Sequence, residues 1–225
     1  MNILAIDTSL ERCSVALRNS GSEHRDIVIT ETIGIGHAEL LPSMVSEVLS
    51  TSALKAVDVD RIGVVCGPGS FAGLRVGLSM ARGMALVNKA DVVGIPTLSA
   101  LATAAAKAAS DLPIVVIQDA RRKELFVQIF DAAGLELGPP QVTTLPALGS
   151  VLPRAAILIG SGAKLVKETL DSSQDMDVIC DVGAPDIEAV LKLTECADHP
   201  FCPPSPIYLR GPDAKKQSGF AVARA

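Results

Sequence analysis

Apolar residues follow one another in short runs along this chain, and each run ends at a polar or glycine-rich turn. A run that ends at Asp7 precedes a short polar turn and a second strand, predicted from Cys13 to Leu17. The same order recurs in the second half, where a run ends at Asp119 and a strand is predicted from Leu125 to Phe130. The pattern predicts two β-hairpins of the same design, each with an acidic residue at its turn.

A second pattern repeats after each hairpin. A buried-strand run over 62–66 leads through the glycine turn Gly67–Ser70 into a helix, and a run over 155–159 leads through Gly160–Gly162 into another. Two interpretations compete: a duplicated pair of α/β domains, or chance among common α/β patterns. The agreement of two signals in the same order favours duplication.

The fold class is therefore predicted to be α/β with two similar halves. An alanine-rich helix predicted over 97–109 closes the first half. We accordingly predict a first subdomain over 1–110, a second over 111–210 and a polar C-terminal tail over 211–225.

The helix predicted over 70–87 has little polar surface, because its polar groups gather on one strip. Small residues recur at every fourth position and form a ridge without bulk, which would let another helix come close. We predict that this helix is a protein interface; the alternative is that the ridge packs only on the sheet of its own domain. The ridge is Gly73, Gly77, Ala81 and Ala85, flanked by Leu74, Leu78 and Met84 and widened by Val76, Met80 and Val87, with Arg75, Ser79 and Arg82 as the polar strip.

A second predicted helix, over 38–49, offers another apolar surface and tolerates Pro42 because that residue lies near its first turn. Two such helices from each of two related chains would form a four-helix interface, and the same surface would allow homodimers when the related chain is absent. The interface residues predicted on this helix are Leu40, Leu41, Met44, Val45, Val48 and Leu49.

Composition narrows the class of protein. The chain is 48% hydrophobic, with a mean hydropathy of +0.39. The longest uncharged stretch, over 92–106, contains Gly94 and Pro96 and is shorter than the roughly 18 residues of a membrane span. No basic region precedes an apolar one at Met1, and the five cysteines lack paired spacing, so we expect a cytoplasmic protein without a signal peptide. The excess apolar content is expected in core or interface.

Charge limits binding to nucleic acid. The net charge of the chain is −5, whereas binding to a nucleic-acid backbone requires a positively charged surface. The stretch DARRKE, at 119–124, is predicted to be a charged hairpin turn. Such a turn is most often only solvated, but Arg121, Arg122 and Lys123 together could contact nucleic-acid phosphate in a larger assembly.

The acidic turn is a weak candidate for a nucleotide site. Asp7 could hold a metal-bound water near a phosphate, but active phosphate hairpins place glycine after the acid, and here Thr8 and Ser9 follow. The alternative is that Asp7 caps its own turn.

The glycine turns are equally weak candidates. Gly67, Gly69 and Ser70 could form an anion nest before a helix N-terminus, or a tight turn with Ser70 as N-cap. Gly160 and Gly162 form the corresponding candidate in the second half, and two glycines alone are weak support.

Metal and nucleophilic chemistry are not indicated. His24, His37 and His199 have no i, i+4 pair, which a zinc hydrolase would need, so no metal site is predicted. No GxSxG is present, and no cysteine stands beside an obvious base, so no catalytic residue is predicted.

Five stretches follow one another along the chain and are compared together: ILAIDTS (3–9), HAELLPSMVSEVL (37–49), GPGSFAGLRVGLSMARGMAL (67–86), DARRKELF (119–126) and PIYLR (206–210). Together they resemble the bacterial TsaB (YeaZ) family of tRNA threonylcarbamoyladenosine biosynthesis proteins, and GPGSFxGLR is highly specific. The family more often has Thr where this chain has Ala72 and Tyr where it has Phe126, so no hydroxyl role is assigned at either position.

The resemblance implies a duplicated actin/hexokinase/Hsp70-like fold with a degenerate cleft between its halves. It implies a noncatalytic adaptor that binds the paralogue TsaD, with TsaE, in the complex that transfers a threonylcarbamoyl group to adenosine 37 of tRNAs reading codons that begin with A. ATP and the metal ion would belong to TsaD, and tRNA would bind only through the assembled complex. The alternatives are an ATP-dependent phosphotransferase of the same superfold and, third, a peptidase of the glycoprotease type.

Overall fold

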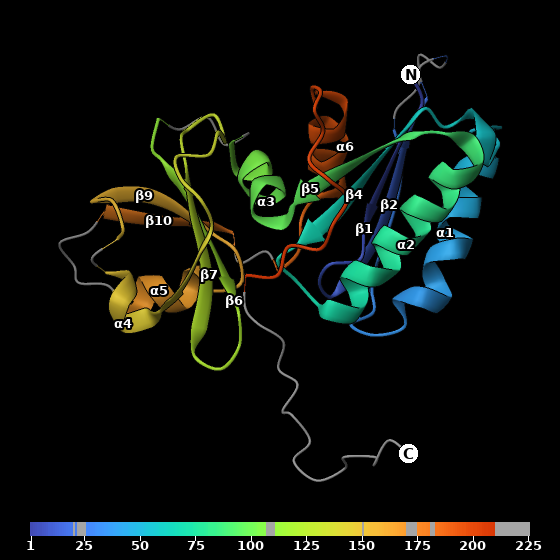
Figure 1. The fold of residues 1–225 in the computed structure, drawn as a ribbon. Coiled ribbons are helices and arrows are strands. Elements are labelled where there is room, and N and C mark those ends of the chain that lie inside the picture. Colours follow the sequence, from blue (N-terminus) through green and yellow to red (C-terminus); the bar gives the residue numbers. More distant parts are fainter. Residues whose placement is uncertain are drawn as a thin grey trace, which may run out of the picture.

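The computed structural model of the chain describes residues 1–19, 21, 26–106, 111–149, 151–169, 175–180 and 183–209. Its strands form two five-stranded sheets (Figure 1). The first sheet contains, in spatial order, β3 (Ile27–Thr32), β2 (Arg12–Arg18), β1 (Ile3–Asp7), β4 (Arg61–Gly67) and β5 (Asp91–Pro96). The second contains β10 (Asp175–Cys180), β9 (Ala155–Ile159), β6 (Ile114–Asp119), β7 (Glu124–Phe130) and β8 (Gln141–Thr144).

The two sheets share one design. β1 pairs antiparallel with β2 and parallel with β4, and β6 pairs in the same way with β7 and β9. Asp7 ends β1 and Asp119 ends β6, which confirms both hairpins and their acidic ends. Because the strand order is repeated in full, the predicted duplicated actin-like α/β fold is confirmed.

Helices cover both faces of the first sheet (Figure 1). Side chains alternate along a strand, so Leu4 and Ile6 of β1 face the core under α1 and α2, whereas Ile3 and Ala5 face the core under α6. The described helices are α1 (His37–Thr51), α2 (Phe71–Asn88), α3 (Thr97–Ala105), α4 (Leu145–Leu148), α5 (Ala163–Thr169) and α6 (Ile187–Glu195), with a 3-10 turn, η1 (Ala56–Asp58).

The end of the chain returns to the first half. The predicted division assigned residues 111–210 to the second subdomain, but α6 packs on β1, β2 and β4 of the first sheet. Arg61, at the start of β4, holds the end of α6, because its guanidinium donates to the carbonyl oxygens of Thr194, Glu195 and Ala197 at 3.1–3.4 Å. This return could not be predicted from local sequence patterns, because it depends on contacts between residues that are distant in the sequence.

The segment after α6, residues 201–208, runs along the ends of β4 and β5. The Gly94 amide donates to the Cys202 carbonyl at 3.0 Å, and the Ile207 amide donates to the Cys66 carbonyl at 2.7 Å. This C-terminal segment therefore covers the edge of the first sheet where β4 leads into its glycine turn.

Between the two halves lies α3, which is the described part of the helix predicted over 97–109; residues 107–110 lie outside the described part. Leu98 and Leu101 of α3 pack with Ile114, Phe130 and Ile157 of the second sheet. The two halves thus share an apolar core.

Candidate functional site: the glycine turns and the α1–α2 surface

Asp7, the candidate acid of the first hairpin, is fully buried. Its Oδ1 accepts a hydrogen bond from the Ser9 amide at 2.8 Å, so the acid caps its own turn. Its Oδ2 accepts no hydrogen bond from any described residue. Burial raises the pKa of this carboxyl from its ordinary value of 3.8 to about 6, although the Ser9 hydrogen bonds oppose that shift. In this conformation solvent does not reach the carboxylate.

The first glycine turn is filled by the chain's own backbone. The Ser70 amide donates to the Ser9 carbonyl at 2.6 Å, and a Cβ on Gly69 would collide with that same oxygen. The Ser70 hydroxyl accepts from the Gly73 amide at 3.3 Å, which confirms Ser70 as the N-cap of α2. The Ser9 carbonyl thus accepts a hydrogen bond from an amide of this turn that could otherwise bind an anion.

The second glycine turn is filled in the same way. The Gly162 amide donates to the Ile117 carbonyl at 3.0 Å, and a Cβ on Gly160, where φ is +107°, would collide with that oxygen. The Ser161 hydroxyl donates to the Gln118 side chain at 2.5 Å and accepts from the Asp119 amide at 3.0 Å. In both halves the glycines let the hairpin backbone come close.

Thr8 explains the glycines inside α2. Its hydroxyl donates to the Gly73 carbonyl at 2.7 Å and accepts from the Gly77 amide at 3.1 Å, so it lies between two backbone groups one helical turn apart. A Cβ on Gly73 would collide with the Thr8 carbonyl, and one on Gly77 would lie 2.6 Å from the Thr8 hydroxyl. This role of Thr8 was not predicted, because nothing in the sequence places residue 8 beside residues 73 and 77.

The predicted small-residue ridge therefore faces the sheet of its own half, and its assignment to an interface with another chain is corrected. Ten residues predicted to lie in the interface are instead buried within this chain. They are Gly73, Leu74, Gly77, Leu78 and Ala81 on α2, and Leu41, Met44, Val45, Val48 and Leu49 on α1. Leu40, Met84 and Ala85 are half-buried and still reach the surface.

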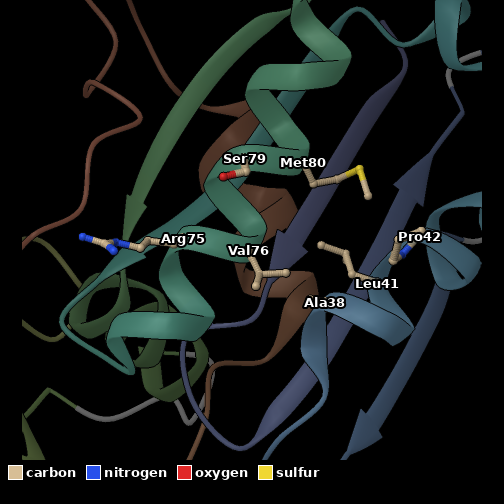
Figure 2. A pocket seen from close by; sticks show the side chains of 7 residues that line it. All are labelled: Ala38, Leu41, Pro42, Arg75, Val76, Ser79 and Met80. Atoms are coloured by element: carbon tan, nitrogen blue, oxygen red, sulfur yellow. The ribbon is translucent and has the colours of Figure 1, made fainter.

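A groove lies between α1 and α2 at the surface, with a volume of about 470 Å³. Figure 2 shows Val76 and Met80 projecting from α2 toward Leu41 and Pro42 of α1, whereas Arg75 and Ser79 point the other way. The lining residues are Ala38, Leu41, Pro42, Arg75, Val76, Ser79 and Met80. The groove is mainly apolar, and Val76 and Met80 had been predicted to lie in an interface.

The last turns of α2 also carry exposed apolar residues. Leu86 is 86% exposed and Val87 is 74% exposed. Gly83 is also exposed, and a Cβ there would meet no atom within 4 Å, unlike those on Gly73 and Gly77. A glycine in a helix interior costs roughly 1 kcal/mol relative to alanine, and at Gly83 no contact within this chain requires that cost.

An exposed aromatic pair lies at the other end of α2. The Phe71 ring lies 5.4 Å from the Tyr208 ring of the C-terminal segment, and the Arg75 guanidinium lies 3.7 Å above the Phe71 ring. These contacts hold the C-terminal segment against α2, which explains why exposed rings occur in a chain with so few aromatics.

The remaining candidate groups are the cysteine thiols and the side chains that could bind a metal ion. Cys13 and Cys66 are buried thiols in strands, as predicted, and burial raises the pKa of Cys13 to about 11 and of Cys66 to about 12. Across the described ranges, no three His, Cys, Asp or Glu side chains gather closely enough to hold a metal ion. In the same part of the chain, no helix has the length and apolarity to cross a membrane.

Comparisons with known proteins fit this architecture. The family model described as TsaD, tRNA N6-adenosine threonylcarbamoyltransferase, matches residues 28–140, half of the chain. A protein of Escherichia coli named tRNA threonylcarbamoyladenosine biosynthesis protein TsaB is 35% identical over 128 residues, which are 56% of this chain and 53% of that protein. A Haemophilus influenzae protein of the same name is 36% identical over 126 residues. The chain thus spans about half the length of the curated relatives it matches first.

Solved structures extend the similarity along the chain. A Pseudomonas aeruginosa structure, described as an uncharacterized protein with similarity to the peptidase YEAZ, has a TM-score of 0.75 and 26% identity, covering 93% of this chain and 99% of that one. A structure described as YeaZ from the same organism has a TM-score of 0.72 and 27% identity, covering 87% and 91%. From the family model, the named relatives and these structures, the chain belongs to the TsaB/YeaZ family.

Proposed function

We propose that this chain is a noncatalytic subunit in the biosynthesis of threonylcarbamoyladenosine in tRNA, and that it binds and activates a TsaD-type partner, with TsaE. Its relatives carry the name of that biosynthesis, and the matching family model is described as the transferase. The partner would hold the ATP and the metal ion, and tRNA would bind through the assembled complex. The group transferred to adenosine 37 would not contact this chain.

One observation carries the noncatalytic part of the proposal: the chain's own carbonyl oxygens fill both glycine turns. Ser9 occupies the first turn and Ile117 the second. A phosphotransferase of this superfold would need backbone amides at those turns to receive phosphate. The burial of Asp7 adds support for a noncatalytic function over the rival phosphotransferase function.

The α1–α2 groove is the surface that we assign to the partner. The groove has a mainly apolar lining, and Leu86 and Val87 are exposed further along α2; exposed apolar side chains of this kind are typical of an interface core. A partner helix lying over the open face of Gly83 could approach closely, since that residue has no side chain in the way. In the absence of TsaD, the same surface would pair two copies of this chain.

Nucleoside mass spectrometry of tRNA from cells depleted of the protein tests the role. We expect threonylcarbamoyladenosine to fall while the threonylcarbamoyl-adenylate intermediate is still made. Re-expression of the wild-type chain serves as the control and restores the modified nucleoside. Unchanged modification after depletion removes the proposed function.

A further inference from the structure

The turn between β6 and β7 has an unusual backbone. Arg121, Arg122 and Lys123 follow one another with φ values of 62°, 56° and 65°, all in the left-handed region. All three residues are exposed, and the hairpin that carries them extends beyond the neighbouring strands of the second sheet (Figure 1). A Cβ atom makes this conformation unfavourable, so turns of this kind normally use Gly, Asn or Asp.

The fold alone does not account for three cations at these positions. Of the described residues other than glycine, two more have a positive φ, Ala53 and Lys89, and each stands alone. A glycine at any of the three turn positions would relieve the backbone without removing a core contact, since all three side chains lie outside the core. Unfavourable conformations of this kind cluster where a ligand is held.

The three basic residues of the turn are exposed. The carboxylate of Asp119 is directed at the backbone, because its Oδ1 accepts from the Arg121 amide at 2.7 Å. Neither the Arg121 guanidinium nor the Lys123 ammonium pairs with another described side chain. Together with Asp119 and Glu124, the turn has a net charge of +1, which suits one or two contacts within a larger binding surface.

We propose that this turn contacts the phosphodiester backbone of the tRNA on which the complex acts. Arginine presents planar donors that match a phosphate, and lysine adds a point charge. Such contacts fix the position of RNA without reading its sequence. The proposal rests on the proposed function, and the net charge of −5 means that most of the affinity for tRNA comes from the partner.

Fluorescence anisotropy of labelled, unmodified tRNA tests the proposal, with this chain alone at low salt and together with TsaD over a salt series. The variant is Arg121→Gly with Lys123→Gly, which relieves the left-handed backbone and so keeps the fold. We expect weaker binding, with the slope of log K against log salt reduced by roughly 0.7–0.9 for each cation removed. The thermal midpoint should equal or exceed that of the wild type.

Lys89→Gly is the matched control for Lys123→Gly, because Lys89 is also an exposed lysine with a positive φ, 58°. It should leave the salt slope unchanged. Equal slopes for wild type and double variant, an equal loss in Lys89→Gly, or no tRNA binding in either format overturns the proposal. A loss of affinity for TsaD in place of tRNA would assign the turn to protein and also overturn it. Failure to bind TsaD, by contrast, contradicts the proposed function.

Discussion

At the scale of single residues, burial decides what the polar groups of the first hairpin can do. Asp7, Thr8 and Ser9, whose order makes only a weak candidate for a nucleotide site, are each nearly or fully buried. Asp7 caps the turn, Thr8 bonds to α2, and the Ser9 carbonyl fills the glycine turn. The hairpin thus holds α2 against the sheet.

Asp7→Asn should stabilise the protein above pH 6. The pKa of Asp7 rises from 3.8 to about 6 on folding, so the folded state holds this proton more tightly than the unfolded state. The contribution of Asp7 to the free energy of unfolding is therefore largest below pH 4, falls as the pH rises to about 6 and stays lower beyond it. Asn keeps an acceptor for the Ser9 amide but cannot ionise. The substitution therefore removes the loss of stability that ionised Asp7 causes, which amounts to at most about 3 kcal/mol at pH 7.

Urea denaturation of both proteins at pH 4.5 and 7.5 measures this effect. The advantage of Asp7→Asn should grow between the two pH values. An advantage independent of pH would mean that Asp7 does not titrate in this range.

Two glycines of α2 should respond in opposite ways to alanine. A Cβ on Gly77 would lie 2.6 Å from the Thr8 hydroxyl, whereas one on Gly83 meets nothing. Gly77→Ala should destabilise by about 1–3 kcal/mol through overpacking, and Gly83→Ala should stabilise by up to about 1 kcal/mol. Thermal unfolding of the two variants checks this pair, each serving as the control for the other. Equal shifts would show that Thr8 does not hold α2 as described.

At the scale of elements, α1 and α2 each divide their surface between two tasks. The faces toward the sheet close the core, and the opposite faces leave a groove and an exposed apolar strip. The predicted ridge on α2 is thus buried against the sheet, and the interface on α1 and α2 stays a proposal that rests on their exposed faces. Both faces are apolar, so hydrophobicity alone did not distinguish them.

Met80→Glu should weaken binding to TsaD about tenfold or more, because it places a charge within an apolar interface. Leu86→Glu should act in the same direction and leaves the core untouched, since Leu86 is 86% exposed. Leu165→Glu is the matched control: Leu165 is also an exposed leucine on a helix, but on α5 of the second half.

Titration calorimetry, after circular dichroism has confirmed folding, gives the affinities. If both Met80→Glu and Leu86→Glu bind TsaD with wild-type affinity, the partner binds to another surface. An equal loss in Leu165→Glu would indicate a general effect of added charge.

At the scale of the whole molecule, the chain repeats one α/β unit, and the elements after the second unit pack against the first half. α6 and the C-terminal segment bridge the repeat, through Arg61 at the end of α6 and Ile207 beside the first glycine turn. A Cβ on Gly67 would lie 2.8 Å from the Ile207 carbonyl, so this segment adds to the filling of that turn. Both glycine turns of the repeated unit are thus filled by the chain itself.

The isolated chain should neither bind Mg-ATP tightly nor hydrolyse it at a useful rate, because the Ser70 and Gly162 amides of the two glycine turns already donate to carbonyl oxygens of the chain itself. Titration calorimetry with Mg-ATP, and a parallel titration of Asp7→Ala, provide the measurement. A micromolar dissociation constant that Asp7→Ala abolishes would restore the phosphotransferase as the better function.

The sequence by itself determined the repeated units, because a buried strand, an acidic turn and a glycine turn are local patterns set by backbone chemistry and side-chain alternation. It also predicted α1, α2, α3 and α5, the strand positions of Cys13 and Cys66, and Ser70 as N-cap as one of two alternatives for the first glycine turn. Only the tertiary structure decided what the glycines are for. Gly69, Gly77 and Gly160 face backbone or side-chain atoms that are remote in sequence, and a glycine that admits the chain's own carbonyl has the same local pattern as one that admits a phosphate.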